Sequence, residues 1–207
     1  MQTIDNEVIV QQQAIRLSEV IKNANGVYVG SARGGAQESF WSRGYDMSAN
    51  NMFKNGFRYN SGSIPEVSSL EKVEFLKGGS ALLYGNVAPG GILNLITKTP
   101  CFTKGGEIAL QMGSNAFYKP SVDFYGPINK SIAYRFTGSY ENSESFREVV
   151  KRERYYINPS FLFNLSPKTQ ITPQGDFMND NWTPDFGTII IGKQVFDLGR
   201  NNYYGAL

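Results

Sequence analysis

Histidine is absent from the 207 residues, and cysteine occurs once, as Cys101. These counts exclude a histidine-based catalytic triad, a Cys/His metal cluster and an internal disulfide. Charge is also sparse and balanced, with 20 basic and 18 acidic residues, so the sequence predicts no nucleic-acid binding. No run of about 18 apolar residues is present, which excludes a membrane-spanning helix from the prediction. Residues 1–10 lack the basic and apolar regions of a signal peptide.

The residue types that are plentiful indicate β structure. The chain contains 14 phenylalanines, 12 tyrosines and 22 glycines. Aromatic residues favour strands, and glycines favour the turns between them. A transmembrane β-strand needs only about 9–11 residues with every second one apolar, so low overall hydropathy is compatible with a membrane.

The first hundred residues mix helical and strand patterns. Residues 11–23 place Ile15, Val20 and Ile21 at near-helical spacing, and Gly26 follows as a helix stop. Three apolar stretches then predict strands, at residues 27–29, 73–76 and 92–97. We therefore expect a small α+β domain.

From Gly105 onward the pattern alternates. In residues 132–141, apolar and aromatic side chains fall on one face and mostly polar ones on the other. Similar stretches predict five strands in all, at residues 107–113, 117–125, 132–141, 155–165 and 171–177. Residues 181–207 read as a long polar and aromatic tail. Short turns alternating with longer loops favour an up-and-down outer-membrane barrel, and a soluble β-sandwich is the alternative.

The stretch "KGGSALLYGNVAPGGILNLITKTP" at residues 77–100 is rich in glycine. It lacks both G-x-x-x-x-G-K-[ST] and G-x-G-x-x-G, so we do not expect a phosphate-binding loop. Ser80 stands where a short helix would be capped. We expect tight turns between strands here, formed by Gly78, Gly79, Gly85, Pro89, Gly90 and Gly91.

The segment "LEKVEFLKGGSALLYGNVAPGGILNLITK" resembles the plug domain of TonB-dependent outer-membrane siderophore receptors. Upstream, "WSRGYDMSANNMFKNGFRY" is similar to the Arg-Gly segment and Asn-Gly turn of that family, and the resemblance continues downstream over nearly the whole chain. Gly79 departs from the proline usual at that position. The resemblance implies a plug domain at residues 1–101 and the first part of a transmembrane β-barrel at 102–207. Since no TonB box is visible and only about five strands follow, we expect a fragment of such a receptor.

The resemblance also implies roles for individual residues. A ferric siderophore would bind at the outward apex of the plug, at Arg33, Asp46, Met47, Asn50, Asn51, Tyr59, Asn60 and Ser61. Among these, asparagine and serine are also ordinary turn residues. Two cations, Arg43 and Lys77, would dock the plug to barrel carboxylates and would be unpaired here. We expect the plug core to contain Trp41, Phe53, Phe57 and Phe75.

Further expectations follow from the same resemblance. The protein would be a monomeric, non-enzymatic receptor in the outer membrane of a Gram-negative bacterium, without a cofactor of its own. Its partners would be the ferric siderophore, the TonB-ExbB-ExbD complex and membrane lipid. Alternatives are another cargo (haem, cobalamin or an oligosaccharide), a detached plug that acts as a binding module, and a soluble enzyme. The basic residues Arg147, Lys151, Arg152 and Arg154 are expected in a solvated loop, with contact to lipopolysaccharide as the alternative.

Overall fold

The computed structural model describes residues 1–48, 50–59, 62–79, 84–196, 199 and 201–205. The chain divides into two compact units, Met1–Lys98 and Thr99–Leu207. The boundary expected from the sequence lay at residue 101. Each unit has its own sheets, and each is described separately below.

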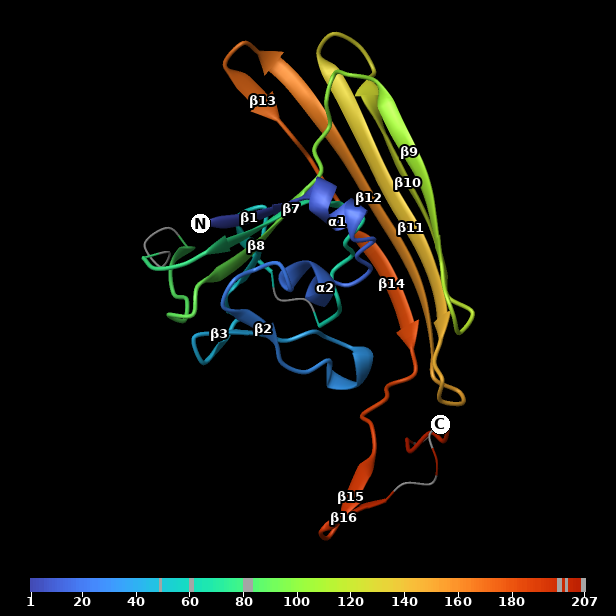
Figure 1. Cartoon of the computed structure of the whole chain (residues 1–207). Helices are drawn as coiled ribbons and strands as arrows, with labels where there is room; N and C mark the ends of the chain where they lie inside the picture. Colours follow the sequence, from blue (N-terminus) through green and yellow to red (C-terminus); the bar gives the residue numbers. More distant parts are fainter. Residues whose placement is uncertain (49, 60–61, 80–83, 197–198, 200, 206–207) are drawn as a thin grey trace. The chain divides into compact units, whose positions relative to one another are not determined.

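A five-stranded sheet organises the first unit. Its order is β1, β7, β8, β5 and β6, at Gln2–Asp5, Leu70–Leu76, Ile92–Thr97, Met52–Lys54 and Phe57–Arg58. Strand β8 lies at the centre, antiparallel to β7 and parallel to β5. Its sequence ILNLIT is buried at nearly every position, as a strand covered on both faces requires. Figure 1 shows β1, β7 and β8 side by side.

The helical prediction for residues 11–23 is wrong in extent. Helix α2, at Leu17–Ile21, lies within the predicted range and confirms part of it, and a separate helix, α1, lies at Asn6–Gln11. Between them Gln13 adopts a left-handed φ of 50°, which no helix continues through. Val20 and Ile21 pack into the core from α2, but their spacing from Ile15 does not reveal the break at Gln13. Among the described residues, no helix is long and apolar enough to cross a bilayer.

A second, three-stranded sheet completes the first unit. It contains β2, β3 and β4, at Val27–Val29, Phe40–Ser42 and Tyr45–Asp46. A short 3₁₀ helix, η1 at Arg33–Gly35, lies in the connection between β2 and β3. The predicted strands at 27–29 and 92–97 are confirmed with the same bounds, and the strand predicted at 73–76 begins earlier, at Leu70.

The core of the first unit includes two of the four aromatic residues expected there. Phe53 and Phe75 are buried, and Trp41 is half-buried. Phe57 contradicts the expectation, because its side chain is 79% exposed. It directly follows the Asn55-Gly56 turn, where the short β6 begins, and strand alternation there turns Arg58 rather than Phe57 toward Phe53.

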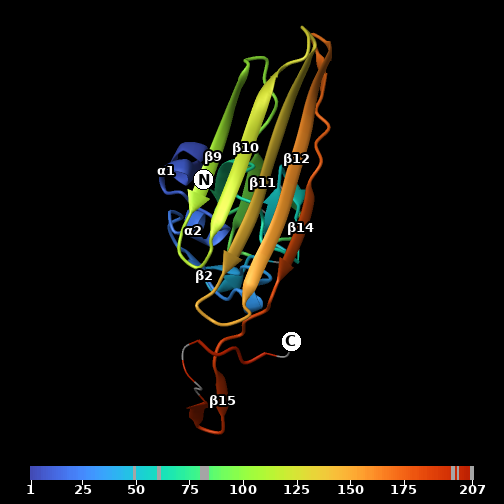
Figure 2. The same ribbon diagram turned by 90° about the vertical axis from the view of Figure 1, so that its right-hand side faces the viewer.

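The second unit contains a six-stranded antiparallel sheet. Four of its strands run up and down in sequence order: β9 at Gly105–Met112, β10 at Tyr118–Pro127, β11 at Ile132–Glu144 and β12 at Lys151–Ser166. Figure 2 shows these four long strands lying next to one another. This arrangement confirms the predicted antiparallel strands and their connections.

The fifth predicted strand, at residues 171–177, is wrong in extent. The structure has β13 at Thr169–Ile171 and β14 at Phe177–Trp182, and both pair with β12. Pro173 lies between them, and a proline has no N–H to donate to a ladder. Pairing with β12 nevertheless continues in one register, from Phe163↔Ile171 through Ser160↔Gln174 to Ile157↔Phe177.

The two faces of this sheet differ in the way that the sequence predicted. Along β12 the exposed face carries Tyr155, Ile157, Phe161 and Leu165. The intervening buried positions are Tyr156, Asn158, Ser160 and Leu162. A soluble sandwich would bury its apolar face, whereas this sheet exposes it, so the pattern does not favour the sandwich alternative.

The predicted tail contains regular structure. A hairpin forms from β15 at Ile189–Ile191 and β16 at Gln194–Phe196. Gly192, with φ of 65°, opens the two-residue turn between the two strands. The alternating pattern of the long strands gave no signal for this hairpin, because three consecutive isoleucines have no period of two.

Candidate functional site

Arg33 lies on the surface of the first unit. It begins η1, is exposed, and has a left-handed φ of 43°. Its Nη1 donates to Oε1 of Gln37 at 3.2 Å, on the same connection. The guanidinium thus remains largely open to solvent and can offer donors to an anionic or carbonyl oxygen.

Asp46 and Met47 have structural roles. Oδ1 of Asp46 accepts from the backbone N–H of Ser48 at 2.8 Å and from its hydroxyl at 2.6 Å, which forms an Asx turn. Met47 has no exposed surface and belongs to the hydrophobic core. The expectation that Met47 contacts a ligand is therefore wrong, because the turn at Asp46 directs the following side chain inward.

Asn51 is also buried, contrary to its expected place on the apex. Its Nδ2 donates to the carbonyls of Ala88 at 2.8 Å and Gly91 at 2.5 Å. Its Oδ1 accepts from the N–H of Ala88 at 2.9 Å. Both donors of the amide and its oxygen are thus used to hold the glycine-rich stretch, and Asn51 is a structural residue rather than a ligand contact.

Arg58 is a residue of this site that the sequence interpretation missed. Its Nη1 donates to the carbonyl of Asn50 and its Nη2 to the carbonyl of Asn86, both at 2.7 Å. Its Cζ lies 5.4 Å from the ring centroid of Phe53. The guanidinium therefore ties the loop before β5 to the loop before β8. The Asn-Gly turn that sets Phe53 opposite Arg58 was a signal that could have located it.

Tyr59 is half-buried and follows Arg58 directly. Its N–H donates to the carbonyl of Met52 at 2.9 Å, and its ring packs against the core with Nζ of Lys54 5.5 Å from the centroid. Asn60 and Ser61 lie outside the described residues. The structure thus joins Asn50, Asn51 and Arg58 into one group with Tyr59 adjacent, whereas the described side-chain contact of Arg33 is with its own connection.

The glycine-rich stretch is constrained in two different ways. Gly91 has φ of 118°, and a Cβ added there would lie 2.7 Å from the carbonyl oxygen of Leu76. Gly90 is constrained by space instead, since a Cβ would lie 2.8 Å from the carbonyl oxygen of Ser42. Gly78 and Gly85 also have positive φ, whereas Gly79 has open space around it and no positive φ. The short helix expected after Ser80 falls on residues outside those described.

The two expected docking cations differ. Arg43 is exposed in the turn between β3 and β4, with φ of 53°. Lys77 was expected to be unpaired, but its Nζ donates to the carbonyl of Asn25 at 2.6 Å and lies 5.1 Å from the ring centroid of Phe75. A backbone carbonyl can satisfy an ammonium without a carboxylate, which the sequence alone could not indicate.

One carboxylate of the first unit is buried. Glu38 is 6% exposed and accepts hydrogen bonds from the hydroxyl and the N–H of Ser18. Burial raises the pKa of this carboxyl above its usual value of 4.5, and the bonds from Ser18 oppose the shift. This perturbed carboxyl lies beside α2 and not in the apical loops.

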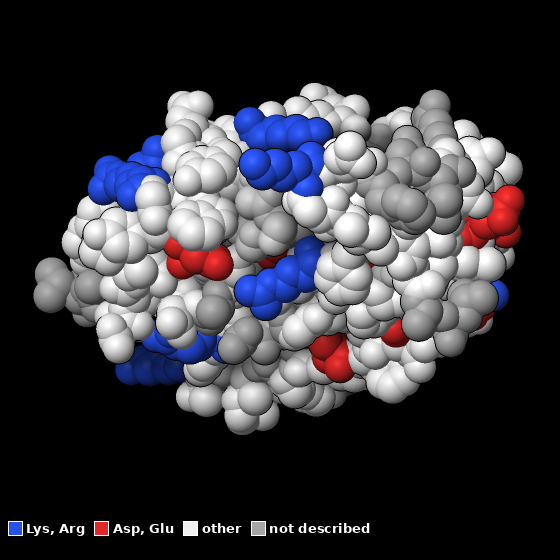
Figure 3. Space-filling view, turned by 90° about the horizontal axis from the view of Figure 1, so that it is seen from below, with Lys and Arg blue, Asp and Glu red and all other residues white. Residues whose placement is uncertain are grey.

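Three of the four basic residues expected in a loop of the second unit contact a carboxylate. Arg152 and Arg154 both contact Asp180 across β12 and β14, and Nε of Arg147 lies 3.4 Å from Oδ2 of Asp185. The expected solvated loop is wrong for Lys151, Arg152 and Arg154, which are residues of β12. Figure 3 shows one face of the molecule, on which basic and acidic side chains form small separate groups in a largely uncharged surface.

Comparison with known proteins identifies the family to which the first unit is related. A family model described as "TonB-dependent Receptor Plug Domain" matches residues 1–92. Over these residues the chain belongs to the TonB-dependent receptor plug domain family. Its first unit corresponds to the plug, and the antiparallel strands of its second unit match structures of such receptors.

Individual receptors support the assignment. The catecholate siderophore receptor Fiu of Escherichia coli strain CFT073 is 30% identical over 197 residues, and the match covers 93% of this chain and 26% of Fiu. The metal-pseudopaline receptor CntO of Pseudomonas aeruginosa strain UCBPP-PA14 is 29% identical over 143 residues, which is 68% of this chain and 20% of CntO. The chain thus spans about a quarter or less of the length of these relatives.

Solved structures agree with the fold. The open form of Fiu from E. coli K12 has a TM-score of 0.81 at 28% identity, over 90% of this chain and 28% of Fiu. The ferripyoverdine receptor of P. aeruginosa has a TM-score of 0.85, and the match covers 99% of this chain and 29% of the receptor chain. Its sequence identity is 21%, so this similarity supports the fold alone.

Proposed function

We propose that this chain takes part in TonB-dependent uptake of a ferric siderophore across the outer membrane of a Gram-negative bacterium. The supporting observation is the tied pair of loops in the plug, where Asn51 and Arg58 hold residues 50 and 86–91 together. Loops fixed in this way present a preorganised surface for a bulky chelate, which lowers the entropic cost of binding. The names of the relatives point to the same cargo class, since they bind metal-pseudopaline, catecholate siderophores or ferrioxamine.

The proposal assigns contacts to four described residues. Arg33 offers open donors, and half-buried Tyr59 offers the accessible part of its ring. Asp46 and Asn50 are exposed in the segment before β5. Asn60 and Ser61 stay in the proposal from the family resemblance alone. No covalent step is needed, so the protein acts as a receptor and not as an enzyme. It needs no cofactor of its own, because iron arrives inside the chelate.

The proposed partners follow from this role. The TonB-ExbB-ExbD complex supplies energy, and the exposed apolar face of β9 to β12 contacts lipid. We propose that residues 99–207 are the first part of the barrel of a monomeric receptor, with Arg43 and Lys77 docking the plug to it. Haem, cobalamin or an oligosaccharide is the alternative cargo.

Binding of defined chelates tests the proposal. The probes are ferrioxamine B, a ferric catecholate, haem and cobalamin, added to the purified protein in detergent. Saturable binding of a ferric siderophore, but not of the iron-free form at the same concentration, is the expected result. Saturable binding of haem or cobalamin alone would contradict the proposed cargo. Fractionation of cells gives a separate test, because recovery of the protein in the soluble fraction would favour the detached plug.

A further inference from the structure

The chain passes from the plug to the second unit across a single peptide link. The N–H of Lys98 donates to the carbonyl of Ser69 at 2.9 Å, inside the first unit. The carbonyl of the next residue, Thr99, accepts from Nη1 of Arg135 at 3.1 Å, inside the second unit. Both sides of the junction are therefore tied, each to its own unit.

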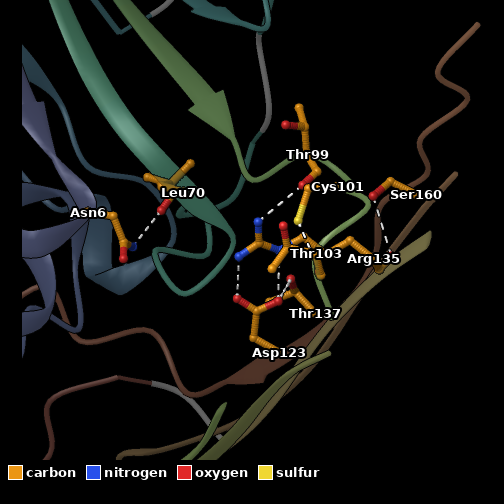
Figure 4. A network of polar contacts seen from close by, with 9 residues as sticks. All are labelled: Asn6, Leu70, Thr99, Cys101, Thr103, Asp123, Arg135, Thr137 and Ser160. Atoms are coloured by element: carbon orange, nitrogen blue, oxygen red, sulfur yellow. Dashed lines mark hydrogen bonds and ion pairs between the residues drawn. The ribbon is translucent and has the colours of Figure 1, made fainter. Parts of the chain in front are cut away.

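Arg135 is held in one orientation by its neighbours, as Figure 4 shows. Its Nε donates to Oδ1 of Asp123 at 2.9 Å, and its Nη2 donates to Oδ2 at 2.7 Å. The hydroxyl of Thr137 also contacts Oδ1 of Asp123, at 3.4 Å. Because the guanidinium is planar and its donors form a rigid fork, two bonds to one carboxylate fix the direction of the third donor, Nη1.

The sheet makes this pair rigid. Asp123 lies on β10 opposite Thr137 of β11, and Arg135 lies opposite Tyr125, so the ion pair crosses between two long paired strands. The Cζ atom of Arg135 is 4.6 Å from the ring centroid of Tyr125. The side chains of Arg135 and Asp123 are only 13% and 10% exposed. Screening of this ion pair by solvent is therefore weak, and the pair can hold the Arg135 guanidinium in the orientation in which it contacts Thr99.

We propose that Arg135 is a positioning residue that anchors residues 99–104, the linker between plug and barrel, to strand β11. A hydrogen bond with a charged donor is roughly twice as strong as a neutral one, so the exposed bond at Thr99 can still hold the linker to β11. If the chain functions in transport as proposed above, the plug would rearrange while residues 99–104 stay attached to strand β11. The anchor itself is independent of which cargo is carried.

The single cysteine supplies a natural reporter for this anchor. Cys101 lies in the linker between Thr99 and Lys104, is half-buried, and its Sγ lies 3.4 Å from the carbonyl of Thr103. Release of the linker should increase the access of a thiol reagent to Sγ, and no other thiol in the sequence competes.

The experiment measures the rate of maleimide labelling of the purified protein in detergent, alongside thermal melting. Arg135→Gln should label roughly 10-fold faster than the unsubstituted protein, the effect of losing one charge-assisted hydrogen bond. Arg135→Lys should fall between the two, because lysine keeps the charge without the fork. Arg147→Gln is the matched control, since Arg147 belongs to the same unit and contacts Asp185 instead, and its labelling rate should not change.

A second variant covers the case in which Arg135→Gln unfolds, since that change removes the arginine charge from beside the buried Asp123 carboxylate. Arg135→Gln combined with Asp123→Asn removes both charges and should label as fast as the single variant. An unchanged labelling rate in this folded double variant would overturn the anchor, and so would an equal increase in Arg147→Gln. The measurement needs no siderophore, so a failure of the proposed cargo and a failure of the anchor are separate results.

Discussion

The side chain of Asn51 pairs with the backbone of Ala88 as a neighbouring strand would. Nδ2 donates to the carbonyl of Ala88 at 2.8 Å, and Oδ1 accepts from its N–H at 2.9 Å. The two residues are 37 positions apart. One amide therefore joins the loop before β5 to the glycine-rich stretch before β8, and the geometry of the proposed apex depends on it.

Removal of this amide should destabilise the plug. Asn51→Ala leaves the N–H and carbonyl of Ala88 and the carbonyl of Gly91 without their partner, which should lower the free energy of unfolding by roughly 2–4 kcal/mol. The melting temperature should fall by roughly 5–15 °C. Asn50→Ala is the matched control, because Asn50 is exposed and receives the main bond from Arg58 at its backbone carbonyl. Equal melting of the two variants would show that the amide pairing is unimportant.

Substitution of the glycines should separate two kinds of constraint. Gly91→Ala forces a side chain into φ of 118° and against Leu76, and Gly90→Val places a side chain against the backbone of Ser42. Each should cost roughly 1–3 kcal/mol or more. Gly79→Ala meets open space without a positive φ, so its melting temperature should stay near that of the unsubstituted protein. A Gly90→Val protein as stable as Gly79→Ala would refute the steric argument.

Loss of the proposed ligand contacts should weaken binding. Arg33 is exposed, so its loss should leave folding unaffected, whereas loss of the Tyr59 ring, which packs against the core, should also lower stability. Arg33→Ala removes a donor and Tyr59→Ala a ring, so the affinity for the ferric siderophore should fall by roughly 5- to 150-fold for each. Lys22→Ala, at an exposed position after α2, is the control and should bind normally. Chelate titration of the three variants gives the comparison. Normal binding by the Arg33→Ala and Tyr59→Ala double variant would move the site to the loop at residues 46–51.

The buried Glu38 should make plug stability depend on pH. Its pKa in the folded state is raised, mainly by burial, so the folded protein binds this proton more tightly than the unfolded chain does. The contribution is fully present below the unfolded pKa near 4.5 and is lost as pH rises through the folded pKa. Glu38→Gln has no such loss, so its stability relative to the parent should increase as pH rises from about 4 to 7.

Denaturant melts of the parent and of Glu38→Gln, at both ends of that pH range, measure the effect. Glu7→Gln serves as the control, because Glu7 is a carboxylate on α1 with an exposed hydrogen bond to Gln11. A stability difference between Glu38→Gln and the parent that stays constant with pH would show that Glu38 does not titrate in this range.

Much of the fold could be predicted because it depends on patterns among residues that are close together in the sequence. The period of two in β10, β11 and β12 gave the strands and the apolar face together, since alternate side chains of a strand point to opposite sides. The Asn55-Gly56 turn is a local signal that could have indicated the β5–β6 pairing, which was not predicted. The long glycine-containing motif identified the plug. The helix predicted at residues 11–23 failed because a near-helical spacing of three apolar residues does not reveal the break at Gln13.

The sequence by itself therefore determined the fold class, the alternation of the second unit and the family, because each depends on neighbours along the chain. Only the tertiary structure decided which of the candidate residues are buried and which are exposed. Asn51 and Met47 are buried, although they were expected to contact a ligand, and Phe57 is exposed, although it was expected in the core. Arg58 and Arg135 bind carbonyls 28 and 36 positions away. Such contacts depend on how distant segments approach one another, and no local period or turn preference encodes that approach.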